Sequence, residues 1–291
     1  MAAAASHARL KTAADLLSWL ERAVSPRLQE TTEAIAHGGT ALTLLGIKGS
    51  TKDVDFAFRS REDFNRFVRA LESIGFRRIA DFRPRPGEVF LRLNNPSSVV
   101  DVVDVRFPIW NSWRVSGKVL RDAVIMRFGK LRLVRLDRDA LFLFKTYPLR
   151  QTDIDDLRTI LEKDPPDEAR VLELFDEQDT IHRSELLRDT RHEPLLNILE
   201  LRVRFAASVD LLGPSLQRKI PRTARLAKRR FKALRLRRGL KNLVQTLRTV
   251  DIVPWDDILG SDFEPLRGRL ARGMAIPPSP RRKRSAGHRG R

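Results

Sequence analysis

The sequence predicts an α+β protein with a small mixed β-sheet core flanked by helices and a helical C-terminal extension. Two observations predict this class. Short β-rich runs separated by turn residues occupy residues 33–135, and helical periodicity dominates from residue 137 onward. Strands first and helices afterwards are typical of α+β folds rather than of doubly wound sheets. Hydrophobic residues make up 42% of the 291, which is enough to bury a core.

The elements expected in the first half are strands placed between two helices. Apolar residues at three- and four-residue spacing predict an amphipathic helix over 10–24 that ends near Pro26. A second helix is expected at 62–74. Strands are expected at 54–58, 89–93, 99–105 and 130–136. The turn-forming run Asn94-Asn95-Pro96-Ser97-Ser98 indicates that two of these strands are antiparallel neighbours.

Helices are expected throughout the second half of the chain. They are predicted at 138–147, 152–162, 167–176, 180–190 and 194–212. The chain therefore divides into a core with its N-terminal helix (1–136), a helical domain (137–212), a basic helical extension (213–276) and a disordered basic tail (277–291). The tail is rich in Pro, Ser, Gly and Arg and cannot bury a core.

Composition excludes several classes of protein. The chain has no cysteine, which excludes disulfide scaffolds, thiolate zinc or iron–sulfur sites and a cysteine nucleophile. Any metal must therefore be held by oxygen or nitrogen. No run approaches the roughly 18 to 20 apolar residues that span a bilayer, so we expect no transmembrane segment and a cytoplasmic location.

A glycine pair followed by two aspartates is the most informative stretch of the sequence. Gly38-Gly39 leads into a short helix, where backbone N–H groups can approach a phosphate closely. Downstream, Asp53 and Asp55 are two residues apart on an expected strand, so both project from one face while Val54 points into the core. Two carboxylates on one face can bridge hard cations such as Mg²⁺, the usual stabilisers of phosphoryl or nucleotidyl transfer.

A third carboxylate is expected from the strand at 99–105, which carries two aspartates in an otherwise apolar run. An unpaired charge on a buried strand is costly, so at least one of the two should face a metal or a cavity. Asp101 and Asp104 are three apart and point to opposite faces, so only one can share the metal face. We favour Asp101, which lies close to the preceding turn, and keep Asp104 as the reserve candidate.

The helices after the sheet supply the fourth element. Lys145 follows a Phe/Leu run at the edge of buried surface, where its compact charge could meet triphosphate oxygens. Asp153 and Asp156 share one helical face. Arg150 is interpreted as structural, pairing with Asp153 or Asp155. His37, beside the glycines, is interpreted as a hydrogen-bonded packing residue.

Gly38-Gly39-Thr40, Asp53-Val54-Asp55, a later strand aspartate and a Lys…Arg-x-x-Asp-x-x-Asp-Leu segment occur in this order. This order resembles the minimal, stand-alone nucleotidyltransferases of the DNA polymerase β-like superfamily. The branch that includes abortive-infection toxins is the most similar. The resemblance covers about residues 30–163.

The resemblance implies a role for each matching residue. Gly38 and Gly39 would contact nucleotide phosphates. Two Mg²⁺ ions, or Mn²⁺, would be held by the catalytic carboxylates Asp53, Asp55 and Asp101. Lys145 and Asp153 would support nucleotide binding, so that the helical domain completes the nucleotide site. Many members carry Gly-Ser instead of Gly-Gly, so Thr40 or Ser50 would have to supply any hydroxyl contact.

Most of the positive charge lies in the C-terminal third. Of 56 Lys and Arg residues, 24 fall in residues 201–291, against 6 of the 37 Asp and Glu residues. Residues 218–241 hold twelve of these basic residues, no acidic residue and an apolar stripe, which predicts basic amphipathic helices. Such density suits phosphate backbones, and we rank RNA ahead of an anionic membrane surface.

Two hypotheses follow. The first is a Mg²⁺-dependent nucleotidyltransferase that moves an NMP from an NTP to an acceptor, either an RNA such as tRNA or a protein hydroxyl. Asp101 would complete the site and help to deprotonate the attacking hydroxyl. By resemblance, it would be the toxin of a toxin–antitoxin pair and bind a cognate antitoxin. The alternative is a catalytically inactive nucleotidyltransferase fold that serves as a basic RNA-binding module.

Overall fold

The computed structural model describes residues 10–79, 90–104, 113–188 and 192–235. Some expected features lie partly or wholly outside these ranges. They are the first residue of the strand at 89–93, the last residue of the strand at 99–105, the end of the helix at 180–190, the basic extension beyond residue 235 and the tail at 277–291. Every residue assigned to the candidate site lies within the described ranges.

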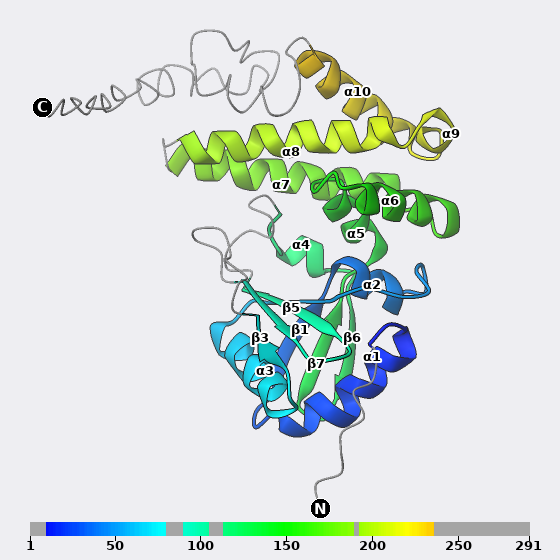
Figure 1. Ribbon diagram of the computed structural model, residues 1–291. Coiled ribbons are helices and arrows are strands. Elements are labelled where there is room, and N and C mark those ends of the chain that lie inside the picture. The colour runs from blue at the N-terminus through cyan, green and yellow to red at the C-terminus, as the bar shows by residue number, and fades with distance from the viewer. Residues whose placement is uncertain (1–9, 80–89, 105–112, 189–191, 236–291) are drawn as a thin grey trace, which may run out of the picture.

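The strands of the described residues form one mixed seven-stranded sheet in the order β3-β4-β5-β2-β1-β7-β6. Their bounds are β1 Thr32–Ala36, β2 Val54–Phe58, β3 Arg77–Arg78, β4 Phe90–Asn94, β5 Val99–Asp104, β6 Val124–Phe128 and β7 Leu131–Arg135. β2 is parallel to β5 and β1 is parallel to β7, whereas the other neighbouring strands are antiparallel. This mixed sheet flanked by helices confirms the predicted fold class (Figure 1).

The turn between β4 and β5 forms as the sequence predicts. The side-chain oxygen of Asn95 accepts hydrogen bonds from the backbone N–H groups of Ser97 and Ser98, at 2.9 and 2.8 Å. An asparagine that binds the backbone two and three residues ahead is a common way to fix a tight turn. The turn makes β4 and β5 antiparallel neighbours, with Arg92 opposite Asp101.

Two helices pack against the apolar face of the sheet. α1 (Ala13–Trp19) continues as a π-helical turn (Leu20–Val24) and a short 3-10 turn (Ser25–Arg27), broadly as expected for 10–24. α3 (Arg61–Ser73) packs on β1, β2 and β5. Phe67 of α3 is fully buried, and its ring centroid lies 5.1 Å from those of Phe56 and Phe58 on β2.

The remaining helices form a second layer above the sheet in the view of Figure 1. Their bounds are α2 Gly38–Leu44, α4 Gly117–Leu120, α5 Arg138–Lys145, α6 Gln151–Lys163, α7 Glu168–Arg188, α8 His192–Leu211, α9 Pro214–Gln217 and α10 Pro221–Arg235. α2 packs on β2 and on α5, so it connects the sheet to the helical part. α7 and α8 pack along each other, and α10 lies against both. No helix in the described ranges is long and apolar enough to cross a membrane.

One helical prediction was wrong. The sequence suggested separate helices at 167–176 and 180–190, but α7 is a single helix of 21 residues. Two of the three residues between the expected helices, Gln178 and Asp179, are polar yet buried. Asp179 is held by two hydrogen bonds from Arg202 of α8, at 2.6 and 2.7 Å. These polar residues resemble a break between two helices in the sequence. In the structure, Asp179 instead joins α7 to α8.

Replacing Phe67 by alanine should lower the free energy of unfolding by about 3 to 5 kcal/mol, because the loss of a fully buried ring leaves a cavity between α3 and β2. Urea unfolding followed by circular dichroism measures this loss. Arg69→Ala is the control, since Arg69 is exposed on the same helix and its replacement should change the free energy by less than about 0.5 kcal/mol. Equal losses in the two variants would contradict this description of the core.

Candidate functional site

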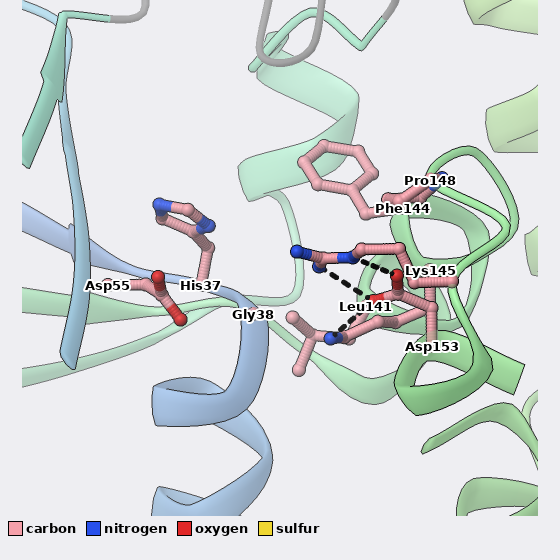
Figure 2. Close-up of a pocket in the computed structure, with 9 residues that line it drawn as sticks. His37, Gly38, Asp55, Leu141, Phe144, Lys145, Pro148 and Asp153 are labelled. Carbon is pink, nitrogen blue, oxygen red and sulfur yellow. Dashed lines mark hydrogen bonds and ion pairs between the residues drawn. The ribbon is translucent and has the colours of Figure 1, made fainter. Parts of the chain in front are cut away.

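A cleft lies between the end of the sheet and the α5–α6 region (Figure 2). Its enclosed volume is about 60 Å³, below the roughly 300 to 1,000 Å³ of small-molecule sites, so it is a shallow cleft. One side is formed by His37, Gly38 and Asp55. The other side is formed by Leu141, Phe144, Lys145, Pro148, Arg150 and Asp153. The cleft therefore brings together four of the residues singled out from the sequence, namely Gly38, Asp55, Lys145 and Asp153.

The glycine pair lets helix α2 begin directly against the acidic strand. Gly38 has a φ of +56°, and a Cβ placed there would lie 2.7 Å from Oδ2 of Asp55. A Cβ on Gly39 would lie 2.7 Å from Oγ1 of Thr51. The Gly39 backbone N–H hydrogen-bonds the Asp55 carboxylate. Side chains larger than hydrogen would therefore push the helix away from the strand.

The two hydroxyl residues of this region lie away from the cleft lining. Thr40 is fully buried, and its Oγ1 accepts a hydrogen bond of 2.7 Å from the backbone N–H of Asp55. Thr40 thus anchors α2 to β2. Ser50 is exposed and does not line the cleft. A hydroxyl contact to a nucleotide from either residue stays a prediction, and the geometry favours an anchoring contact for Thr40.

Strand register places Asp101, and not Asp104, beside Asp55. In the parallel pair β2/β5, Asp55 is the direct partner of Asp101, whereas Asp104 is the partner of Phe58. Side chains alternate between faces along a strand, so Asp104 points with Phe58 toward the α3 face. There Asp104 is fully buried, with Nη1 of Arg61 3.7 Å from its Oδ2. Asp104 is therefore not placed to share a metal with Asp55.

Asp55 is the candidate carboxylate whose ionisation is most opposed by its surroundings. Burial raises the pKa of Asp55 to about 7, and the neighbouring charge of Asp101 adds to this shift. The charge of Asp53, just before β2, acts in the same direction. The positive charge of Lys145 and the hydrogen bond from Gly39 act against it. Burial is thus the main reason that Asp55 resists ionisation, and a divalent cation beside it would favour the charged form.

Arg92 is the residue of this site that sequence reasoning missed. It lies opposite Asp101 on β4 and donates two hydrogen bonds to it, Nε to Oδ1 at 2.7 Å and Nη2 to Oδ2 at 2.6 Å. Such two-point arginine–carboxylate pairs are among the strongest charged contacts in proteins. The pairing of β4 with β5 places the two side chains together, and only a correct register prediction could have found it.

Asp53, Asp55 and Asp101, here called the acidic group, meet only some of the requirements of a site for a hard divalent cation. Among the residues that the structure describes, no three His, Asp or Glu side chains are gathered closely enough to hold a metal ion. Asp53 and Asp55 offer carboxylate oxygens, the ligands that Mg²⁺ and Mn²⁺ prefer. Both oxygens of Asp101 are already bound by Arg92. The cation therefore stays a prediction. Asp53 and Asp55 would be its first ligands, and Asp101 would either share its carboxylate between the cation and Arg92 or exchange Arg92 for the cation.

A network of opposite charges forms the helical side of the cleft. Nζ of Lys145 lies 3.0 Å from Asp153 Oδ1 and 2.7 Å from Asp156 Oδ2. Burial disfavours the charge on Lys145, but the two aspartates outweigh burial and hold its pKa above the ordinary value. Lys48 also binds Asp156, at 2.7 Å. Lys145 is therefore a fixed positive charge that faces Asp55 and His37 across the cleft (Figure 2).

Arg150 pairs with Asp153, as the sequence suggested. Its Nε donates to Asp153 Oδ2 at 2.6 Å and its Nη2 donates to Oδ1 at 3.1 Å. Burial opposes ionisation of Asp153, yet Arg150 and Lys145 outweigh it and hold the pKa of Asp153 below its ordinary value. Because Arg150 also lines the cleft, it adds a second positive group to the one expected from Lys145.

His37 lines the cleft instead of serving only as a packing residue. It precedes α2 as the residue that caps it without a side-chain hydrogen bond. Burial lowers the pKa of His37 to about 4, and the charge of Lys145 lowers it further. At neutral pH the imidazole is therefore uncharged and can accept or donate one hydrogen bond. Its position beside the glycines was the only available signal in the sequence.

The loop between α5 and α6 is held in an unusual backbone conformation. Leu149 has a φ of +56°, which non-glycine residues rarely adopt. Helix α8 supports this loop, because Arg204 Nη1 donates to the carbonyl oxygen of Tyr147 at 3.0 Å and the hydroxyl of Ser208 donates to that of Thr146. Strained backbone persists only where its surroundings fix it, and it is common at binding sites.

No protein-family model matches the sequence, and no curated protein matches it. Membership in the DNA polymerase β-like superfamily therefore stays a prediction that rests on the residues and geometry described above.

Gly38→Ala should destabilise the protein more than Gly46→Ala does. Both glycines have positive φ, +56° and +76°, but only at Gly38 would the new methyl group meet a neighbour. Gly46→Ala should therefore show backbone strain alone, about 1 kcal/mol, and Gly38→Ala should lose at least about 1 kcal/mol more. Urea unfolding measures both. Equal losses would mean that the close approach of α2 to Asp55 is not required.

The raised pKa of Asp55 predicts a pH-dependent stability in the absence of metal. The folded protein keeps the Asp55 proton up to about pH 7, whereas the unfolded chain releases it near the ordinary value of 3.8. Between these two values the folded state binds more protons, so its stability falls as pH rises. Relative to Asp55→Asn, the wild type should lose free energy of unfolding from pH 5 to pH 7 in EDTA. If the difference in free energy of unfolding between the wild type and Asp55→Asn did not change with pH, the raised pKa of Asp55 would be refuted.

Proposed function

We propose that this protein is a Mg²⁺- or Mn²⁺-dependent nucleotidyltransferase that transfers an NMP from an NTP to an acceptor. The observation that carries the proposal is the juxtaposition of Asp55 and Asp101 on neighbouring parallel strands beside a glycine-initiated helix. Positive charge lines the opposite side of the same cleft. Phosphoryl-group transfer requires carboxylates that bind divalent cations and, facing them, basic groups that bind the phosphates.

The chain's own residues divide into two functional sides. Asp53 and Asp55, joined by Asp101, would hold the divalent cations, which supply charge stabilisation to the triphosphate when bound. By the resemblance, Gly38 and Gly39 would contact phosphate oxygens through their backbone; the space that a side chain would fill at Gly38 is taken by Asp55. Lys145 supplies a fixed positive charge on the other side, within the electrostatic reach of Asp55.

The basic extension supports a polyanionic acceptor. Exposed basic side chains follow one another from the end of α9 into α10, and no acidic residue lies between 218 and 235. They are Arg218, Lys219, Arg222, Arg225, Lys228 and Arg229. Such a surface binds phosphate backbones with strong salt dependence. We propose an RNA, such as tRNA, as the acceptor, ahead of a protein hydroxyl. We also propose a toxin role in the cytoplasm with a cognate antitoxin, which rests on the resemblance alone.

One observation favours a second candidate function. The two-point contact of Arg92 with Asp101 neutralises the carboxylate that the transfer reaction needs. A nucleotidyltransferase fold that has lost its metal site and serves as a basic RNA-binding module would show such a contact. The presence of both Asp53 and Asp55 favours the enzyme hypothesis. The two carboxylates repel each other, and an RNA-binding module would have no use for them.

Incubation with each radiolabelled NTP, Mn²⁺ and total RNA or cell protein should transfer label from at least one NTP. Asp55→Asn should reduce the rate by about 100-fold or more, since its carboxylate would be a metal ligand. Asp155→Asn is the matched control, because Asp155 is exposed on α6 and does not line the cleft. It should leave the rate unchanged.

Thermal unfolding separates the two functions. The enzyme should be stabilised by an NTP together with Mg²⁺, and this stabilisation should disappear in Asp55→Asn. An RNA-binding module would show neither effect but would still retain RNA at low salt. Equal labelling by wild type and Asp55→Asn would refute the metal assignment.

A further inference from the structure

Arg92 and Asp101 form the most tightly bound charged pair of the acidic group. They are direct partners across the antiparallel β4/β5 pair, and the guanidinium binds both carboxylate oxygens. Asp101 is only 7% exposed, so water cannot replace this partner fully. A buried carboxylate without a partner would be costly, so the contact with Arg92 stabilises the fold when no other cation is near.

The guanidinium of Arg92 also lies in the field of the other two carboxylates. Its hydrogen bonds to Asp101 hold the pKa of Arg92 above the ordinary value, and partial burial opposes this shift. The negative charges of Asp53 and Asp55 raise it further. By its two hydrogen bonds Arg92 neutralises Asp101, as a bound divalent cation would.

Arg92 and a metal ion compete for the same oxygen atoms. Each oxygen of Asp101 accepts one hydrogen bond from the arginine, at 2.7 and 2.6 Å. A cation that takes Asp101 as a ligand would lie within a few ångström of the guanidinium, and like charges at that distance repel each other strongly in a partly buried site. The arginine side chain is 35% exposed, so it has a path toward solvent when it is released.

We propose that Arg92 is an internal counter-ion that occupies Asp101 in the resting protein and that a divalent cation must displace to complete the site. This inference rests on the proposed nucleotidyltransferase function. Displacement costs binding energy, so the metal alone binds weakly. A triphosphate lowers that cost, because its negative charges offer the released guanidinium a new partner. Metal binding is thereby coupled to the arrival of the NTP.

Mn²⁺ binding, measured by electron paramagnetic resonance on the full-length protein, tests this coupling without reliance on activity. Arg92→Gln should bind Mn²⁺ alone about tenfold more tightly than the wild type, since two charge-assisted hydrogen bonds no longer compete. Addition of a non-hydrolysable NTP analogue should tighten Mn²⁺ binding more in the wild type than in Arg92→Gln.

Two further variants make the test specific. Arg59→Gln removes another arginine–carboxylate contact of the sheet, the 2.6 Å pair with Glu33, and should bind Mn²⁺ as the wild type does. Arg92→Lys keeps the positive charge but cannot bind both oxygens in parallel. Its affinity should lie between those of the wild type and Arg92→Gln. The lysine variant also serves if the glutamine variant, checked by thermal unfolding in EDTA, does not fold.

The outcomes separate this inference from the proposed function. Mn²⁺ binding by the wild type with no gain in either Arg92 variant would overturn the role of Arg92 and leave the metal site intact. Absence of Mn²⁺ binding in every variant, with and without the NTP analogue, would overturn both. A gain in affinity for Arg59→Gln equal to that of Arg92→Gln would show an effect of net charge alone and would also overturn the inference.

Discussion

The burial of two adjacent carboxylates is the constraint on which the rest of the site depends. The parallel pairing of β2 and β5 places Asp55 directly beside Asp101, where both are partly or fully withdrawn from water. Three neighbouring elements each supply a group that stabilises one of these carboxylates. Helix α2 brings a backbone N–H to Asp55, β4 brings Arg92 to Asp101, and α5 brings the charge of Lys145 across the cleft. The local structure around the strand pair follows from the need to neutralise these charges.

The helical part of the protein contributes to this neutralisation because it is built to hold Lys145 in place. Asp153 and Asp156 bind the ammonium group from α6, and α8 supports the intervening loop through its contacts with Tyr147 and Thr146. The buried pair of Arg202 and Asp179 joins α8 to α7. A chain of polar contacts therefore runs from the helical core to the cleft, and it explains why a leucine is tolerated at positive φ between Pro148 and Arg150.

Sequence patterns predicted the elements whose signal is local. The apolar face of α3, the turn at Asn95 and the β-rich run of β5 each follow from spacing or turn chemistry within a few residues. β1 was missed because Thr32–Ala36 is rich in alanine and contains glutamate, residues that are uncommon in strands. It forms a strand because β2 and β7 pair with it on both sides. α7 was divided in two because buried polar residues look like a surface break when their partner on α8 is unknown.

The sequence by itself determined the fold class and the chemistry on offer: a glycine pair, three carboxylates in order, a lysine beside an apolar run, no thiol ligands and a basic C-terminal third. Tertiary structure decided which of these groups meet. Strand register separated Asp101 from Asp104, close packing assigned Thr40 to anchoring, and the β4/β5 pairing revealed Arg92 as the partner of Asp101. The physical reason is that register and packing are set by contacts between residues far apart in the chain, whereas sequence patterns report only what neighbouring residues do.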